Sequence, residues 1–330
     1  MSVFSALHHA APPGVAVEIG SAGVSAATID WRGGRPVVSS HIAEALADGA
    51  LVPSLTAANV HDRAAVMRIL ARVVDHLGRP RRVGLIVPDV VAKVSLVKFE
   101  KVPARTADLD QLVRWQVRKA APFPIEEAQV SCDTGLKTSE GQEFVVSLAR
   151  RSIIQEYEGL CAEAGAQAGI VDISTFSVIN AVLAGRSERV ADREASAERS
   201  MSDWLLVHVA ADYASIAILR GPHVIFFRNR AAEDSRETTL ASLVHQTAMY
   251  YEDRLKGGGF ARVVLAGGGG AQTDVEQVRR SLQERLAARI ESVDVTSSAT
   301  LADRISVGGA MADSLAPLVG LLLRDQEAAA

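Results

Sequence analysis

Three short stretches place glycine, small or acidic residues directly after an apolar run, and these are the residues best suited to chemistry. They are Glu18-Ile-Gly20-Ser21, His208-Val-Ala210-Ala211 and the glycine run at 267–270. Glycine lacks a Cβ, so the backbone there can approach a ligand closely, and a neighbouring carboxylate can help to hold a hydrated cation. The same residues also form ordinary turns at strand ends, so both interpretations stay open.

Other catalytic patterns are absent from the sequence. No Gly-Lys-Ser/Thr follows the glycine run, no dinucleotide fingerprint follows Val87, and neither Gly-x-Ser-x-Gly nor His-Glu-x-x-His occurs. His208 lies alone in an apolar strand, which favours a packed imidazole over a catalyst. The sequence therefore offers no evident catalytic residue, and an enzymatic activity stays uncertain.

Composition limits the class of protein. The 330 residues are 48% hydrophobic with a formal net charge of −4, enough for two lobes and without the excess of positive charge that favours nucleic acid. Two cysteines, Cys132 and Cys161, are too few for a disulfide scaffold, which suits a cytoplasmic protein. The apolar stretch at 315–323 is about half the length that a bilayer crossing needs, so we expect membrane contact only through partners.

The apolar pattern predicts strands and helices in a repeated order. Strands are expected at 15–20, 25–30, 37–42 and 83–87, with a helix at 63–76 before the last. After the nearly apolar-free segment 186–202, strands at 205–210, 215–219, 224–227 and 263–266 recur around a helix at 238–255. This order predicts an internal duplication of strand, strand, strand, helix, strand.

A small mixed unit interrupts the first copy. Strand patterns at 94–99, 129–134 and 144–148 surround a helical pattern at 108–119. That helix carries Trp115 and ends at Pro122-Phe123-Pro124, where each proline disfavours helical geometry in the residue before it. The corner makes Phe123 a rigid apolar plug, whose burial in the core of this unit is favoured over partner contact.

The order Trp115-x6-Pro122-Phe123-Pro124-x-Glu-Glu resembles the type IV pilus assembly protein PilM family. Further stretches are similar to that family in the same order: 143–153, 161–165, 171–176 and 316–324. The resemblance covers about Val15 to Arg324. It implies an α/β, actin-like (RNase H-like) fold of two lobes with a nucleotide cleft.

The resemblance also implies a division of the chain. We expect a flexible leader at 1–13, a first lobe at 14–185 with an inserted α+β subdomain at about 88–150, and a mobile linker at 186–202. A second lobe at 203–324 and a tail at 325–330 complete the chain.

In the actin and Hsp70 superfamily, two hairpin turns and a glycine-rich motif hold ATP, and carboxylates at the hairpins help to hold Mg²⁺. The resemblance implies ATP and Mg²⁺ as cofactors here and makes Glu18 the metal candidate. The implied nucleotide-binding residues are Glu18, Gly20, Ser21, Ala210, Gly267, Gly268 and Gly269. The second hairpin has His208 and Ala210 where the superfamily has an acid and a glycine, which implies weak or absent hydrolysis.

PilM-like proteins are cytoplasmic and bind the tail of the inner-membrane protein PilN. The resemblance therefore implies an adaptor of a pilus machine, peripheral to the membrane through PilN-like and other pilus partners, with Trp115 and Phe123 as candidates for the groove. Alternatives are an active ATPase or kinase of the superfamily, a cytoplasmic component of a type II secretion system of the GspL kind, and a division protein such as FtsA. The FtsA alternative lacks the amphipathic terminus it needs, and self-association stays open.

Overall fold

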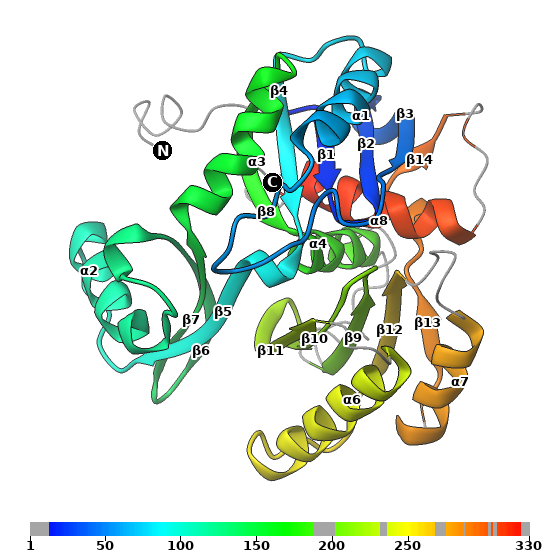
Figure 1. Ribbon diagram of the computed structural model, residues 1–330. Coiled ribbons are helices and arrows are strands. Elements are labelled where there is room, and N and C mark those ends of the chain that lie inside the picture. Colours follow the sequence, from blue (N-terminus) through cyan, green and yellow to red (C-terminus); the bar gives the residue numbers. More distant parts are fainter. Residues whose placement is uncertain are drawn as a thin grey trace.

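A computed structural model gives the fold (Figure 1). It describes residues 13–187, 202–231, 236–267, 275–286, 288–302, 305 and 309–324. Residues 1–12 of the expected leader, most of the expected linker, the tail, and Gly268 and Gly269 lie outside the described residues. The boundaries of the lobes thus stay predictions.

Two sheets repeat one strand order, as the sequence predicted. The first sheet has the order β14-β3-β2-β1-β4-β8 and the second β11-β10-β9-β12-β13. In each, three antiparallel strands precede two strands that run parallel to the first of them. The first sheet consists of β1 (Val15–Ile19), β2 (Gly23–Arg32), β3 (Arg35–Ala45), β4 (Arg82–Val87), β8 (Gln167–Ile173) and β14 (Thr300–Leu301), and the second of β9 (Asp203–Val209), β10 (Tyr213–Arg220), β11 (His223–Ala231), β12 (Arg262–Gly267) and β13 (Ile290–Ser292).

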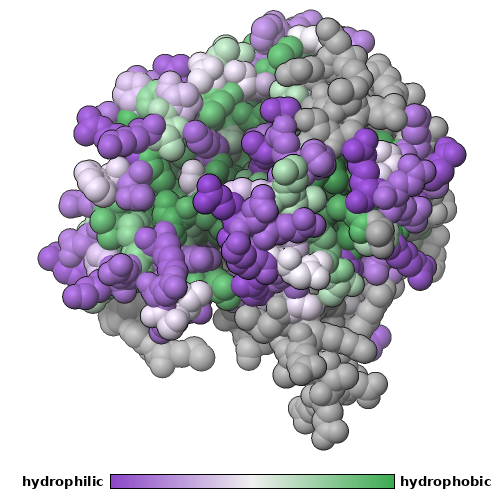
Figure 2. All heavy atoms as spheres, turned by 90° about the horizontal axis from the view of Figure 1, so that it is seen from below, coloured by the Kyte–Doolittle hydropathy of each residue, from purple (hydrophilic) through white to green (hydrophobic). Residues whose placement is uncertain are grey.

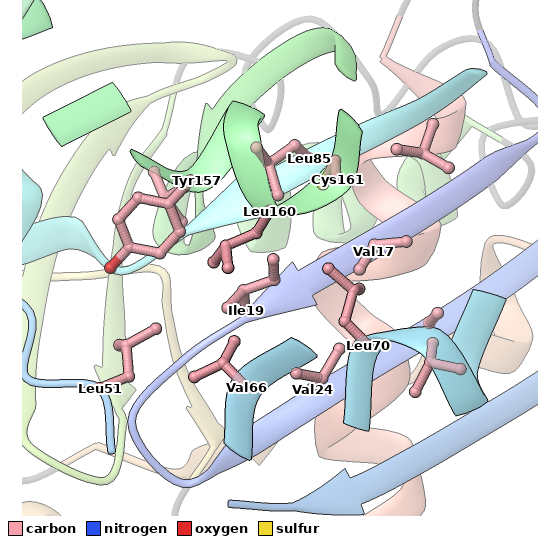
Figure 3. Packing of buried hydrophobic residues seen from close by; sticks show 14 of the residues in the cluster. Val17, Ile19, Val24, Leu51, Val66, Leu70, Leu85, Tyr157, Leu160 and Cys161 are labelled. Carbon is pink, nitrogen blue, oxygen red and sulfur yellow. The ribbon is translucent and has the colours of Figure 1, made fainter. Parts of the chain in front are cut away.

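Helices bury their apolar stripes against these sheets. Helix α1 (Arg63–His76) repeats apolar residues at helical spacing, and its first turn is capped by the Asp62 carboxylate, which accepts from the amide of Ala65 at 2.9 Å. Together with α3 (Arg151–Glu163) it covers one face of the first sheet. Figure 3 shows Leu70 from α1 and Leu160 from α3 facing the strand residue Ile19.

Helices α4 (Ser174–Ser187) and α8 (Gly309–Leu323) lie between the two sheets (Figure 1). One apolar cluster includes Ile86 of the first sheet, Leu206 of the second and Leu318 of α8. The two helices cross so closely at Gly320 that a Cβ there would lie 1.7 Å from the carbonyl oxygen of Ser177. Close backbone contact and shared apolar burial thus join the lobes on this side.

The inserted unit has its own small core. Its sheet has the order β5-β7-β6, from β5 (Ala92–Phe99), β6 (Ala128–Thr138) and β7 (Gly141–Arg150), and α2 (Thr106–Val117) packs against it. Three short 3-10 turns flank these elements: η1 (Asp89–Val91), η2 (Arg118–Ala120) and η3 (Ile125–Glu127). The strands and the helix lie where the sequence pattern predicted them.

The second lobe contains elements that the sequence analysis did not predict. Helix α6 (Arg236–Asp253) matches the expected helix, but α7 (Val275–Leu286), β13, the turn η4 (Val295–Ser297) and β14 were not anticipated. Strand β14 pairs with β3, so a segment beyond the second sheet joins the edge of the first. Among the described residues, no helix combines the length and hydropathy needed to cross a bilayer.

Candidate interlobe site

The β1–β2 and β9–β10 turns share a backbone hydrogen bond. The amide of Gly20 donates to the carbonyl of Gly23 at 2.9 Å, and the amide of Ala210 donates to that of Tyr213 at 2.9 Å. Glu18 pairs in register with Ser25, and His208 pairs with Ser215. Gly20 therefore corresponds to Ala210 and Glu18 to His208, which places the candidate hairpins at equivalent points of the two lobes.

Glu18 is held by two hydroxyl groups. Ser174 at the start of α4 donates to Oε1 at 2.7 Å, and Ser25 donates to Oε2 at 3.4 Å. Burial raises the pKa of Glu18, and the bond from Ser174 opposes that rise. The only carboxylate that the sequence nominated thus faces the protein's own donors.

Asp89 is a site residue that the sequence analysis missed. It follows β4 in η1 and is fully buried. Its Oδ1 accepts from the amide of Thr175 at 2.9 Å, and its Oδ2 accepts from the hydroxyls of Thr175 and Ser215, the latter at 2.5 Å. An acid two residues after a buried parallel strand was the available signal, because carboxyl ends of such strands meet at one edge.

His208 extends this arrangement. Its Nδ1 lies 2.8 Å from Oγ1 of Thr175 and 3.9 Å from Oδ2 of Asp89. The single hydroxyl hydrogen of Thr175 goes to Asp89, so Thr175 can only accept from His208, which places a hydrogen on Nδ1. His208 is therefore the packed, hydrogen-bonded imidazole that the sequence favoured, with the ring of Tyr213 at 5.9 Å in edge-to-face contact.

The two described glycines of the candidate site have different structural roles. Gly267 has φ of 75°, and a Cβ there would lie 2.1 Å from the carbonyl oxygen of Val209, so the protein's own packing requires glycine. At Gly20 the nearest atom to an added Cβ is the carbonyl oxygen of Gly23 at 4.0 Å. Gly20 thus leaves space in front of its turn, beside Ser21.

The residues present fit a nucleotide only in part. The open space at Gly20 suits close approach by a phosphate. The carboxylates of Glu18 and Asp89, however, already accept hydrogen bonds, and within the described ranges no three His, Cys, Asp or Glu side chains are grouped to hold a metal ion. The described side chains therefore do not fit a Mg²⁺ ion held directly by carboxylates from both hairpins.

A further carboxylate lies at the end of β8. Asp172 accepts from Nη1 of Arg324 at 3.2 Å, which ties β8 to the end of α8. Burial raises its pKa to about 6, and Arg324 only partly opposes that rise.

The two partner candidates differ in exposure. Trp115 on α2 is 70% exposed, the largest value among the exposed large hydrophobic side chains of the described residues. Phe123 is partly buried and packs against the core of the inserted unit, as the sequence favoured. On the face drawn in Figure 2, hydrophobic residues lie among hydrophilic ones.

The repeated sheets, the facing hairpins and the two helices between them define an actin-like, two-lobed protein with an inserted subdomain. The model of the type IV pilus assembly protein PilM family matches residues 16–239. The chain belongs to this family.

One of three similar solved structures, the first described below, agrees with the fold. A structure described as the PilM-PilN type IV pilus biogenesis complex superimposes with a TM-score of 0.77 at 17% identity, covering 94% of this chain and 98% of the other. The cytoplasmic domain of EpsL from the Vibrio cholerae type II secretion system gives a TM-score of 0.49 at 10% identity, covering 96% and 94%. A Bacteroides thetaiotaomicron protein of unknown function with an actin-like ATPase fold gives 0.46 at 11%, covering 90% and 96%. No curated protein matched the sequence.

Proposed function

We propose that this protein is a cytoplasmic, actin-like adaptor of a type IV pilus machine that binds the cytoplasmic tail of a PilN-like inner-membrane protein. The family match over residues 16–239 carries the proposal. The similarity to the solved PilM-PilN complex over 94% of the chain supports it. Such an adaptor lies at the membrane through its partner.

Trp115 supports a peptide-binding role for the inserted unit. A tryptophan that is 70% exposed leaves a large apolar surface in water, and tryptophan is enriched among residues that dominate binding energy. Phe123 packs against the core of the same unit and would fix the shape of a groove rather than contact the peptide directly. An extended tail in such a groove would gain backbone hydrogen bonds and side-chain pockets.

The interlobe site supports an adaptor over an active ATPase. His208 and Ala210 replace the acid and glycine of the second hairpin, and Glu18 is bonded to Ser174. We propose that ATP, when it binds, places its phosphates at Gly20 and Ser21 and is hydrolysed slowly or not at all. Under the same hypothesis, the glycine-rich motif at Gly267, Gly268 and Gly269 contacts the adenosine of ATP.

Isothermal titration of the full chain with a synthetic PilN-like tail peptide tests the adaptor. We expect binding, and we expect Trp115→Ala to weaken it by about tenfold or more, because hot-spot truncations cost about 2 kcal/mol. Trp31→Ala is the matched control, since Trp31 is 45% exposed on β2, outside the inserted unit. Absence of peptide binding by the unsubstituted protein would overturn the proposal, and equal losses in both variants would remove Trp115 from it.

Phosphate release from Mg-ATP separates the adaptor from the enzyme. The adaptor predicts release no faster than in buffer, in the presence and absence of the tail peptide. Rapid release that Glu18→Ala abolishes would favour an active ATPase instead.

A further inference from the structure

A cluster of five polar residues spans the two lobes, and we call it the Asp89 cluster: Asp89, Thr175, His208, Ser215 and Asn229. Asp89 and Thr175 belong to elements of the first lobe, η1 and α4, whereas the other three lie on β9, β10 and β11 of the second. Ser215 donates to the Asp89 carboxylate at 2.5 Å, and Nδ2 of Asn229 donates to the Asp89 carbonyl at 2.8 Å. One residue therefore binds two strands of the opposite lobe.

The residues of this cluster are buried, so loss of their hydrogen bonds would be costly. Asp89, Thr175 and Ser215 are each 0% exposed, and His208 is 6% exposed. A carboxylate in such surroundings is tolerated only when donors replace the water it has lost, and separation of the lobes would remove those that the second lobe supplies. The cluster therefore opposes separation of the lobes at this site.

The same position is where the fold family joins its lobes through a cation and a nucleotide, and the described side chains do not fit a cation held directly by carboxylates of both hairpins. We propose that the Asp89 cluster is a built-in latch that holds the β9–β10 hairpin against the first lobe without nucleotide. Closure then depends on the chain itself, and the arrangement of the inserted unit relative to the second lobe is set before any ligand binds. The latch does not rest on the proposed binding of a PilN-like tail.

Distance measurement between the lobes tests the latch in the full chain. Spin labels at Arg68→Cys on α1 and Glu252→Cys on α6, both exposed, report the separation in a Cys132→Ser background. For the nucleotide-free protein we expect one narrow distance distribution that Mg-ATP leaves unchanged. Asp89→Ala should add a longer-distance population, increased by about ten- to a hundredfold, because hydrogen bonds to charged groups contribute about 1.5–3 kcal/mol.

Two further variants distinguish a latch from a local fold defect. Ser215→Ala removes one donor from the second lobe and should shift the distance distribution in the same direction by a smaller amount. If Asp89→Ala does not fold, Ser215→Ala alone tests the latch. Asp62→Ala removes the cap of α1, a bond within the first lobe, and should lower stability without lengthening the distance. A broad distance distribution in the nucleotide-free protein that Mg-ATP narrows would overturn the latch. Distributions that stay unchanged in Ser215→Ala, and in Asp89→Ala if that protein folds, would also overturn it.

The outcome is separable from that of the adaptor. Peptide binding reports the inserted unit, whereas the distance distribution reports the lobes. A protein with a narrow distribution and no affinity for the tail would retain the latch and lose the adaptor.

Discussion

Corresponding positions of the two lobes carry different residues at the edge where the lobes meet. Glu18 pairs with Ile86 in the first sheet and His208 with Ala266 in the second, so Val87 corresponds to Gly267. Two residues further along the sequence, the first lobe has Asp89 and the second has Gly269, which lies outside the described residues. The sequence of the first lobe thus has a carboxylate shortly after β4, whereas that of the second has a run of glycine after β12.

This difference shows that duplication of the backbone does not duplicate the chemistry. Ser25 and Ser215 occupy the same place in their hairpins, yet Ser25 bonds to Glu18 of its own lobe and Ser215 to Asp89 of the other. In the hydrogen bonds to Asp89 that cross between the lobes, the first lobe therefore supplies the acceptor and the second supplies the donors, Ser215 and Asn229. Symmetric sheets with complementary polar groups give an interface that fits in only one arrangement.

The largest effect is expected at Gly267. Gly267→Ala should lower the free energy of unfolding by about 3 kcal/mol, because its Cβ would meet the Val209 carbonyl oxygen at 2.1 Å and its φ of 75° disfavours a side chain. Urea denaturation followed by circular dichroism measures the loss.

Gly78→Ala is the matched control for that prediction. Gly78 has the same φ of 75°, but no atom lies within 4 Å of an added Cβ, so only the conformational cost of about 1 kcal/mol applies. Equal losses at both positions would show that the contact with Val209 does not matter.

A pH-dependent effect is expected at Asp172. In the first sheet, Asp172 pairs with Ile86. At the comparable place in the second lobe, directly after Ser292 of β13, the chain has the buried apolar residue Val293. Burial raises the pKa of Asp172 from 3.8 to about 6, so the folded state binds more protons than the unfolded state between these values. Stability contributed by protonated Asp172 is present below pH 4 and is lost as the pH rises towards 6, by about 3 kcal/mol in total.

Unfolding of Asp172→Asn across pH 4 to 7 checks this sign. The variant should lack the part of the decline that the unsubstituted protein shows between pH 4 and 6. Asp62→Asn, an exposed change at the cap of α1, serves as the control and should leave that decline in place. A difference between Asp172→Asn and the unsubstituted protein that is constant with pH would contradict the raised pKa.

The sequence was sufficient to predict the repeated sheets but not the contacts between the lobes. Apolar runs bounded by glycine, such as Val15 to Gly20, indicated strands because local burial patterns carry that information. Helix α7 was missed because its sequence is strongly polar, and the two-residue β14 is defined only by its pairing with β3. Family resemblance supplied the fold, which local patterns alone left open.

The Asp89 cluster could not be predicted because its members are far apart in the sequence. Asp89 and Ser215 are separated by 126 positions and Asp89 and Thr175 by 86. The sequence around a serine or threonine does not show that its hydroxyl bonds to a distant carboxylate, and only the fold brings these groups together. Glu18 was named as a candidate because a carboxylate and a glycine share one short turn, whereas its partner Ser174 was not.

The smallest effect on stability is expected at the first hairpin. Gly20→Ala should change the free energy of unfolding by no more than about 0.5 kcal/mol, because the nearest atom to its Cβ is 4.0 Å away. If phosphate approaches this turn as proposed, the same change should weaken ATP binding by about tenfold through crowding by the added methyl group. Ala210→Gly, at the corresponding position of the second hairpin, should leave ATP affinity nearly unchanged, since His208 already departs from the phosphate-binding pattern. Titration with ATP and urea denaturation of both variants test the asymmetry, and equal losses of affinity would show that both hairpins contact the nucleotide.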